Sequence, residues 1–365
     1  MTRPHADLYR QLFLDKTPML DVRAPVEYAR GAFPHTRNIP LLDDDERHQV
    51  GIRYKQQGQQ AAIDLGNQLV SGERREKRMQ AWQDWREQHP QGWLYCFRGG
   101  LRSQTVQTWL AEAGSDVPLV PGGYKALRRF LLDSLEQQLQ RTPLILLCGR
   151  TGTGKTRVIE ALTNSIDLEG RAHHRGSAFG RRPAGQPAQI DFENAIAIDL
   201  LHLHAAGQNP VVVEDESKLV GRCVVPPPLQ EKMKAAARVI IDEPLDSRVQ
   251  VTLEDYVIGP LEEYSAFYGQ EQAMDKLAEA LLGALDRIRR RLGGDRHSHV
   301  HKLMLTALAA QQRDGNNELH RHWIAFLLSE YYDPMYDYGQ QFRSDDVLFS
   351  GTREEVREYL KPGRR

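Results

Sequence analysis

Two short segments of this chain carry residues whose types and spacing suit chemistry on anions. The first starts with a cysteine and continues with two arginines, two glycines and a serine: Cys96, Arg98, Gly99, Gly100, Arg102 and Ser103. Glycines let backbone N–H groups turn inward and arginines add positive charge, so the loop is predicted to cradle an anion. A cysteine at the mouth of such a cradle is expected to be held partly as the nucleophilic thiolate. The alternative is a buried cysteine at a strand end, since free cysteine is among the most buried residue types.

The second segment matches the phosphate-binding pattern G-x-x-x-x-G-K-[ST] at every position. It consists of Gly149, Arg150, Thr151, Gly152, Thr153, Gly154, Lys155 and Thr156. Glycines bring backbone N–H groups onto a phosphate, Lys155 neutralises charge, and the Thr156 hydroxyl can hold Mg²⁺. A buried strand is predicted before this loop and a helix after it, which is the context that the pattern requires. We therefore predict a phosphate site and leave its need for Mg²⁺ open.

Both segments are predicted to follow strands of open α/β sheets. The predicted strands are residues 19–23, 38–41, 92–95, 117–120, 143–148, 211–216 and 239–242. Helical patterns separate them, most clearly at 8–14, 43–89, 124–139 and 157–162, and residues after 253 are mostly helical. Ligands of open α/β sheets bind at the carboxyl ends of strands, where Cys96 and the second segment lie.

Five further polar residues are candidates for supporting roles. Asp21 and Arg23 end the first strand, and for Asp21 we favour a salt bridge that closes the strand end over a catalytic role. Asp215 lies in a run of three acids, in which either it or Glu216 organises a metal ion or all three form a solvated strand end. Arg175 and Ser177 lie in a loop that is too polar for a core and is placed to reach a ligand.

Composition limits the class of protein. The 365 residues carry a net charge of −1, which gives no overall attraction to nucleic acid, but residues 171–182 and 287–302 are strongly basic. Such runs are usually solvated faces and bind phosphates only beside a site. No apolar run approaches membrane-spanning length, and the first residues lack a signal-peptide core, so we expect no membrane association. Three scattered cysteines favour a reducing cytoplasm.

The two anion loops and the composition predict three parts. Residues 1–140 are expected to hold the first open sheet, 141–258 the phosphate-binding domain, and 259–365 a helical C-terminal region. The last part contains an aromatic cluster at residues 331–338, which either stacks on bases or packs the C-terminal helices.

Two family patterns occur in this order along the chain. Residues 20–23 with Glu27, the Asn-Ile-Pro of residues 38–40 and the cysteine loop resemble a rhodanese domain over roughly residues 10 to 135. With the phosphate-binding loop and the segments at 46–58, 174–180 and 331–336, the chain resembles the bacterial tRNA 2-selenouridine synthases over essentially its full length. The order of the motifs and the intervening segments make this resemblance specific.

The resemblance implies a function that composition does not show. This family replaces the sulfur of wobble 2-thiouridine in tRNA with selenium from selenophosphate. It also uses geranyl diphosphate to make S-geranyl-2-thiouridine, the intermediate in which sulfur is activated as a leaving group. The family's rhodanese cysteine falls on Cys96, and its P-loop on residues 149–156. Neither the set of tRNAs nor the oligomeric state follows from the sequence.

The cysteine loop departs from the simple rhodanese pattern. Cys96 to Arg102 spans seven residues, whereas thiosulfate sulfurtransferases have a six-residue loop. The longer loop resembles those of rhodanese-fold phosphatases and arsenate reductases, which enclose tetrahedral oxyanions. We therefore hypothesise that Cys96 meets selenophosphate, taking up selenium or positioning the donor, and that the P-loop binds geranyl diphosphate. The alternatives are a persulfide carrier, or a P-loop kinase with a phosphate-sensing rhodanese domain.

Overall fold

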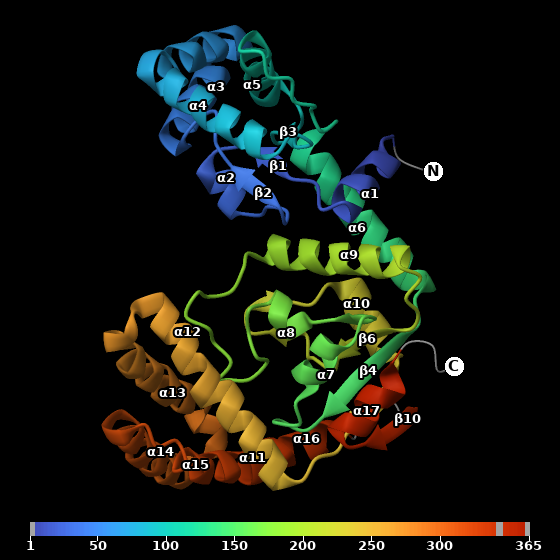
Figure 1. Ribbon diagram of the computed structural model, residues 1–365, viewed down its shortest axis with the longest axis vertical. Helices are drawn as coiled ribbons and strands as arrows, with labels where there is room; N and C mark the ends of the chain where they lie inside the picture. The colour runs from blue at the N-terminus through green and yellow to red at the C-terminus, as the bar shows by residue number, and fades with distance from the viewer. Residues whose placement is uncertain (1–3, 341–345, 362–365) are drawn as a thin grey trace. The chain divides into compact units, whose positions relative to one another are not determined.

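Parallel sheets organise both halves of the chain in this computed structural model, which describes residues 4–340 and 346–361 (Figure 1). The chain divides into two compact units. The first comprises Met1–Gln137 and Ala188–Ala205, and the second Gln138–Pro187 and Ala206–Arg365. The predicted α/β class is confirmed. The division at residues 140 and 258 stays a prediction.

The first unit is built on a three-stranded parallel sheet in the order β2-β1-β3. The strands are β1 (Met19–Asp21), β2 (Thr36–Asn38) and β3 (Trp93–Tyr95). A parallel bridge from Leu94 to Leu119 extends the sheet beyond β3. The predicted second strand lies too late in the chain, because β2 ends at Asn38 and Pro40 cannot donate a ladder hydrogen bond.

Helices cover this sheet and build the core of the first unit. They are α1 (Ala6–Leu14), α2 (Pro25–Ala29), α3 (Asp44–Leu69), α4 (Gly72–Gln88), α5 (Leu101–Glu112), α6 (Gly123–Arg141) and α9 (Gln189–Ala205). The core joins strand residues such as Leu20 and Leu94 to Trp82 and Trp85 of α4. The α9 helix follows the P-loop in sequence but packs on α1, and its Asp191 accepts a hydrogen bond from Ala32 N at 2.6 Å.

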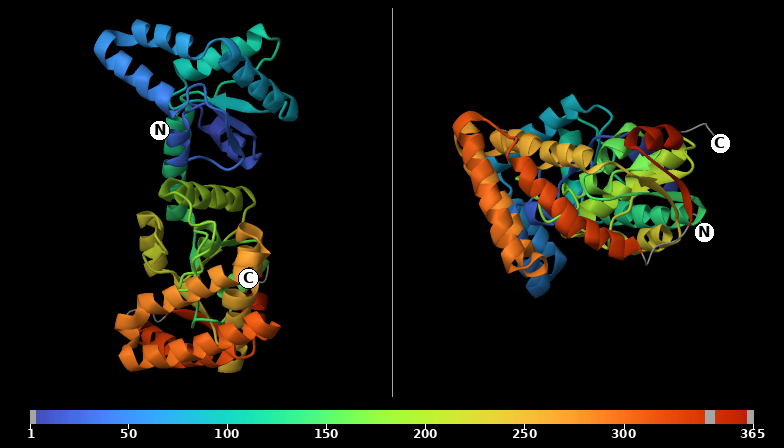
Figure 2. Two further views of the ribbon diagram at one scale, coloured as in Figure 1. Left: turned by 90° about the vertical axis from the view of Figure 1, so that its left-hand side faces the viewer. Right: turned by 90° about the horizontal axis from the view of Figure 1, so that it is seen from below.

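Helix α3 is two helical arms joined at a sharp bend. An Asp43–Glu46 capping box starts the first arm, and Gly58 breaks the helix with φ 84° and ψ −175° (Figure 2). This backbone conformation is essentially restricted to glycine. The second arm therefore folds back beside the first, which a run of helical residues at 43–89 does not by itself predict.

The second unit is built on a five-stranded parallel sheet in the order β10-β9-β4-β6-β5. Its strands are β4 (Leu144–Gly149), β5 (Ser165–Ile166), β6 (Val211–Glu214), β9 (Ala237–Ile241) and β10 (Val347–Gly351). A separate antiparallel pair joins β7 (Leu219–Val220) to β8 (Cys223–Val224). Strand β10 lies within the region predicted to be helical. The chain thus returns near its C-terminus to add an edge strand to the phosphate-binding sheet.

Helices of the second unit pack on this sheet and on one another (Figures 1 and 2). They are α7 (Lys155–Ala161), α8 (Leu168–Arg171), α10 (Pro227–Lys234), α11 (Leu245–Leu253), α12 (Gly259–Tyr268), α13 (Gln270–Leu292), α14 (Gly294–Asp314), α15 (His320–Leu327), α16 (Asp333–Gln340) and α17 (Arg353–Leu360). Two π-helical segments, Glu254–Ile258 and Leu328–Tyr332, interrupt this region. None of the helices within the described ranges is long and apolar enough to cross a membrane.

Candidate functional site

Cys96 lies at the carboxyl end of β3, and its loop leads directly into α5. The cysteine is 3% exposed, and its Sγ lies 3.2 Å from the Ser103 Oγ. The first helical hydrogen bond of α5 runs from Gln104 N to Gly100 O. The preceding N–H groups therefore have no acceptor within the helix and are available to an anion.

The hydroxyl of Ser103 links the cysteine to the loop backbone. Ser103 is fully buried, and its Oγ donates to Gly100 O at 3.0 Å. In that arrangement the hydroxyl oxygen accepts from the Cys96 thiol, since a hydroxyl carries only one hydrogen. Rotation of the hydroxyl hydrogen toward sulfur would support a thiolate instead. Ser103 thus can serve both protonation states of Cys96.

The first turn of α6 holds the cysteine loop from the other side. Tyr124 N donates to Cys96 O and Lys125 N to Phe97 O, both at 2.9 Å. Gly123 directly precedes Tyr124 and has φ 58°, and a Cβ there would fall 2.3 Å from Cys96 O and 2.5 Å from Gly99 N. Backbone can approach this closely only at a glycine.

Replacing Gly123 with alanine is therefore expected to displace the cysteine loop. Gly114→Ala is the matched control, because Gly114 also has positive φ (81°) but has no atom within 4 Å of a built Cβ. The control should lose about 1–2 kcal/mol of unfolding free energy, the cost of the left-handed backbone. Gly123→Ala should lose more, and alkylation of buried Cys96 should accelerate at least about tenfold as the loop opens. Urea unfolding and alkylation mapped by mass spectrometry measure both effects, and equal behaviour of the two variants would contradict this account.

The two arginines of the loop differ in their surroundings. Arg98 is exposed, whereas Arg102 makes a two-point ion pair with Glu27, at 2.5 and 3.1 Å. Glu27 also pairs with Arg47 at 3.1 Å. Burial raises the pKa of Glu27, but the bonds and charge of Arg102 outweigh burial and hold that pKa below its usual value. An anion in the loop would compete with Glu27 for Arg102.

Asp21 and Arg23 form a buried ion pair at the end of β1. Arg23 NH2 lies 2.6 Å from Asp21 Oδ2, and the two side chains are almost inaccessible to solvent. The Arg23 guanidinium also donates to Gly31 O and stacks on Tyr124, 3.8 Å from the ring centre. The pair ties β1 to the start of α6. This is the salt bridge that we favour for Asp21 from the sequence, rather than a catalytic role.

The P-loop of the second unit joins β4 to α7. Lys155 Nζ donates to Gly149 O at 2.9 Å, and Thr156 Oγ1 donates to Glu169 Oε2 at 3.1 Å. Gly152 and Gly154 both have positive φ, 83° and 78°, so alanine would be strained at either position. In this structure Lys155 thus bonds to Gly149 O and Thr156 to Glu169, and the oxygens of a bound phosphate can replace these partners.

Two carboxylates face the P-loop lysine. The pKa of Glu216 is raised to about 8, chiefly by burial and then by the charge of Glu169, while Lys155 acts in the opposite direction. Burial also raises the pKa of Glu169. Glu214 has a structural role, because its Oε2 accepts from Leu168 N at 2.7 Å at the start of α8. Negative charge at this site is costly unless a cation or a proton balances it.

Two arginines from later in the chain hold the outer side of the P-loop. Arg248 is 3% exposed, and its Nε donates to Thr151 O at 2.9 Å while Asp333 accepts from both terminal nitrogens. Arg353 Nε donates to Thr153 O at 2.9 Å. Asp333 belongs to the predicted aromatic segment, whose Tyr331 is buried in the helical core. The start of that segment thus packs on the C-terminal helices and positions Asp333, while Tyr338 is 65% exposed and base stacking there stays a prediction.

The other predicted site residues of the second unit pair with different partners. Arg150 pairs with Asp337 at 2.7 Å, and Asp215 lies 3.5 Å from the Cys148 sulfur. The side chain of Arg175 pairs with Glu263 at 3.1 Å, and Ser177 Oγ donates to Tyr256 OH at 3.0 Å. Within residues 4–340 and 346–361, no three His, Cys, Asp or Glu side chains form a metal-binding group. Any Mg²⁺ requirement stays a prediction.

A basic basin of about 830 Å³ lies in the second unit. None of the lining residues is acidic, and the lining cations are Arg181, Arg182, Arg222, Arg287, Arg290 and Arg291. His174 also lines the basin, and burial and the nearby arginines lower its pKa. The basin joins the two basic runs of the sequence, although residues 292–302 do not line it. Burial and the charge of Arg181 lower the pKa of Arg287. Gly176 links the basin to the P-loop, since a Cβ there would meet Glu169 and Glu216 oxygens within 3 Å.

Comparison with known proteins identifies the family. The family model described as the tRNA 2-selenouridine synthase AAA domain matches residues 142–364. A protein of Alcanivorax borkumensis named tRNA 2-selenouridine synthase is 60% identical over 96% of this chain and 97% of its own length. The chain belongs to the tRNA 2-selenouridine synthase family. Family members from Pseudomonas fluorescens Pf-5 and Marinobacter nauticus are 53% and 48% identical, over at least 97% of each chain.

One solved structure is also similar in sequence. It is the N-terminal domain of a Clostridium difficile 630 protein named for ATP/GTP binding, 31% identical over 32% of this chain and 90% of that chain. Its TM-score of 0.29 is too low to support an argument about this synthase-family fold.

Three residues near the P-loop of this tRNA 2-selenouridine synthase family member were not predicted as site residues, and a fourth, Glu216, was predicted only as one of two acids that could organise a metal ion. Glu169 and Glu216 face Lys155, and Arg248 and Arg353 hold the P-loop from outside. Glu216 carried a detectable signal, because it ends a predicted strand of the P-loop sheet, whereas Glu169 follows β5, which is not among the predicted strands. The arginines carried none, since their partners are about 100 and 200 residues away in sequence.

Proposed function

We propose that this chain replaces the sulfur of wobble 2-thiouridine in tRNA with selenium from selenophosphate, through S-geranyl-2-thiouridine made with geranyl diphosphate. The proposal rests on family membership and on one structural observation. A cysteine loop and a P-loop, each suited to an anion, occur in one chain with a basic basin beside the P-loop. Selenophosphate, geranyl diphosphate and tRNA are all anions.

The geranylation step is proposed at the P-loop. The 2-thiouridine sulfur attacks the first carbon of the geranyl chain, the bond from that carbon to diphosphate oxygen breaks, and the base gives up its N3 proton to solvent. Lys155 and the loop N–H groups would stabilise the departing diphosphate. Because Glu169 and Glu216 concentrate negative charge there, a cation that accompanies the diphosphate would be favoured.

The selenation step is proposed at the cysteine loop. Selenium of selenophosphate bonds to C2 of the base, the C2–S bond breaks, and geranylthiol leaves with a proton. Water then cleaves the Se–P bond and releases phosphate. Transfer of selenium onto the Cys96 sulfur would need an oxidant, since both groups are nucleophiles. We therefore propose that Cys96, Arg98 and the N–H groups at the start of α5 position selenophosphate.

Mass spectrometry of nucleosides tests this proposal directly. Thiolated tRNA incubated with the protein and geranyl diphosphate should yield S-geranyl-2-thiouridine, and added selenophosphate should convert it to 2-selenouridine. Unchanged tRNA together with ATP turnover would instead support the P-loop kinase alternative. Labelling of Cys96 by thiosulfate without any change in tRNA would support a persulfide carrier.

The basic basin is proposed to bind the tRNA backbone. Arg290→Gln with Arg291→Gln removes two lining cations, whereas Lys276→Gln with Arg313→Gln removes two cations outside the lining. The first pair should weaken tRNA binding and reduce the slope of log affinity against log salt by about 2, roughly one unit per lost phosphate contact. Filter binding across a salt series measures this slope. An equal effect of the two pairs, or salt-independent binding, would exclude the basin.

A further inference from the structure

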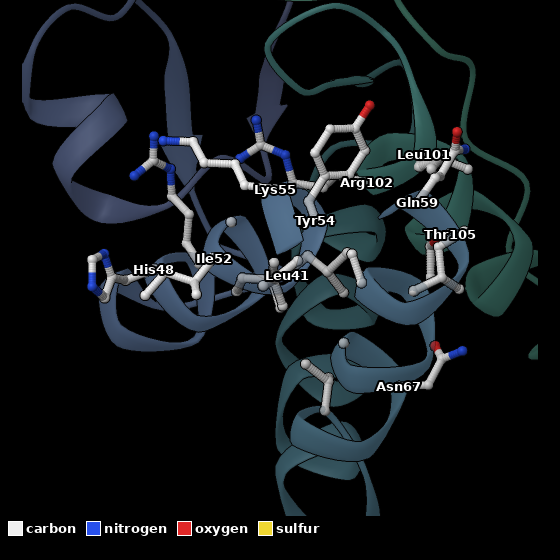
Figure 3. Close-up of a pocket in the computed structure, with 18 of the residues that line it drawn as sticks. Leu41, His48, Ile52, Tyr54, Lys55, Gln59, Asn67, Leu101, Arg102 and Thr105 are labelled. Carbon is white, nitrogen blue, oxygen red and sulfur yellow. The ribbon is translucent and has the colours of Figure 1, made fainter. Parts of the chain in front are cut away.

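An apolar pocket with a basic rim lies in the first unit, between the two arms of α3 and helix α5 (Figure 3). Its volume is about 540 Å³, within the range of roughly 300–1,000 Å³ that small-molecule sites occupy. The apolar lining includes Leu41, Val50, Ala62, Ile63, Val70 and Trp109. The bend at Gly58 creates this space by folding the second arm of α3 back beside the first.

Apolar side chains at the mouth of the pocket are unusually exposed. Ile52 is 42% exposed, Tyr54 57% and Leu101 48%. Large apolar residues grouped at a concave site mark a surface that binds something apolar. The pocket is therefore suited to a hydrocarbon chain rather than to a polar small molecule.

The rim adds positive charge to this apolar interior. Arg47, Lys55 and Arg102 are permanent cations, and Glu27 is the one carboxylate among the lining residues. Figure 3 shows Lys55 and Arg102 close together on one side of the pocket. An apolar chain attached to a polyanion complements both the interior and the rim.

The pocket adjoins the cysteine loop. Leu101 and Arg102 line it, and they are the last two residues of the seven-residue loop that begins at Cys96 and the first two of α5. By contrast, the apolar cavity that Thr151 of the P-loop lines measures about 20 Å³. The first unit therefore provides a chain-sized apolar space, and it does so beside the proposed selenation site.

We infer that this pocket holds the geranyl group of S-geranyl-2-thiouridine in tRNA while selenium displaces the sulfur. The inference rests on the proposed function and locates the leaving group of its second step. The rim cations bind phosphates of the same RNA, and the apolar lining binds the geranyl chain. Free geranyl diphosphate is not the occupant, because its diphosphate belongs to the P-loop in this scheme.

Leucine substitutions on two walls test the inference with matched controls. A Cβ on Gly66, which lines the pocket, would meet only Val50 Cγ2 at 4.0 Å, so Gly66→Leu fills space without a backbone clash. Thr105→Leu fills the opposite wall. Ala61→Leu and Gln104→Leu add the same side chain on the same helices at positions outside the lining.

The measurement compares an anticodon stem-loop RNA carrying S-geranyl-2-thiouridine with the same RNA carrying 2-thiouridine. The unmodified chain and both control variants should bind the geranylated RNA at least about tenfold more tightly, because apolar surface is buried. Gly66→Leu and Thr105→Leu should lose this preference and still bind the 2-thiouridine RNA. Their selenation of geranylated RNA should fall at least about tenfold, with geranylation from geranyl diphosphate unchanged.

The outcomes separate this inference from the proposed function. If the unmodified chain makes neither S-geranyl-2-thiouridine nor 2-selenouridine, the proposed function fails. If it makes both, but the pocket variants behave as their controls do, only the pocket inference fails. Loss of geranylation or of free geranyl diphosphate binding in Gly66→Leu would assign the pocket to the donor instead and overturn the inference. Thermal unfolding shows whether each variant folds. If one of the two pocket variants does not fold, the variant on the opposite wall provides the test.

Discussion

Cys96→Ala is expected to abolish selenation of tRNA while leaving S-geranylation at its normal rate. Cys96 lies in the loop proposed for selenophosphate, in the first unit, whereas Lys155 and the P-loop lie in the second. Because Cys96 is proposed to position selenophosphate, its loss should lower the rate of selenation by about 10²-fold or more. Mass spectrometry of nucleosides from tRNA incubated with both co-substrates should therefore show S-geranyl-2-thiouridine accumulating.

The control for this variant is Cys223→Ala. Cys223 is 1% exposed, so the same atoms are removed from an equally buried position outside both loops. It should keep both activities. If Cys96→Ala lost geranylation and selenation equally, the separation of the two steps between the two loops would be wrong.

Lys155→Met is expected to slow geranylation by about 10² to 10³, because one group that stabilises the departing diphosphate is lost. Selenation of tRNA supplied already geranylated should not change. The two substrates thus isolate the P-loop step from the cysteine-loop step. Initial rates of S-geranyl-2-thiouridine formation, measured against geranyl diphosphate concentration, give the size of the effect.

Arg157→Met provides the matched control on α7. Arg157 is a cation two residues from Lys155, but it pairs with Glu254 and Asp255 at 2.7 and 3.0 Å rather than contacting the P-loop. Its replacement should leave geranylation within about twofold, as for a surface ion pair. ATP hydrolysis stimulated by tRNA and abolished in Lys155→Met, with geranylation intact, would assign the P-loop to a nucleotide.

The elements that could be predicted from the sequence are those whose structure depends on residues close together in the chain. The P-loop was predicted because its glycines, its lysine and the strand and helix around it lie within 20 residues. The acids after β6 show where such patterns stop. Strand β6 ends at Glu214, so strand alternation does not set the directions of Asp215 and Glu216. Glu216 lies with Glu214 near Glu169, whereas Asp215 lies beside the Cys148 sulfur. Sequence could place three acids at this strand end but could not choose Glu216 over Asp215.

Long-range contacts account for what the sequence did not predict. Strand β10 pairs with β9 across more than 100 residues, and it lies in a region whose average pattern is helical. The bend at Gly58 and the pocket beside it depend on how two helical arms pack. Arg102 was predicted to bind an anion, but its pairing with Glu27, 75 residues earlier in the chain, could not be predicted from local pattern.

The bracing of the P-loop by late residues has a consequence for biosynthesis. Arg353 bonds to Thr153 O, and β10 completes the edge of the sheet, yet both are translated about 200 residues after the P-loop. The first unit is likewise incomplete until α9 has been translated, and α9 follows the P-loop in the chain. Domains generally fold as units during synthesis, N-terminal first. Here neither unit can finish folding in that order, so nascent chains stalled before residue 347 should lack a stable phosphate-binding loop.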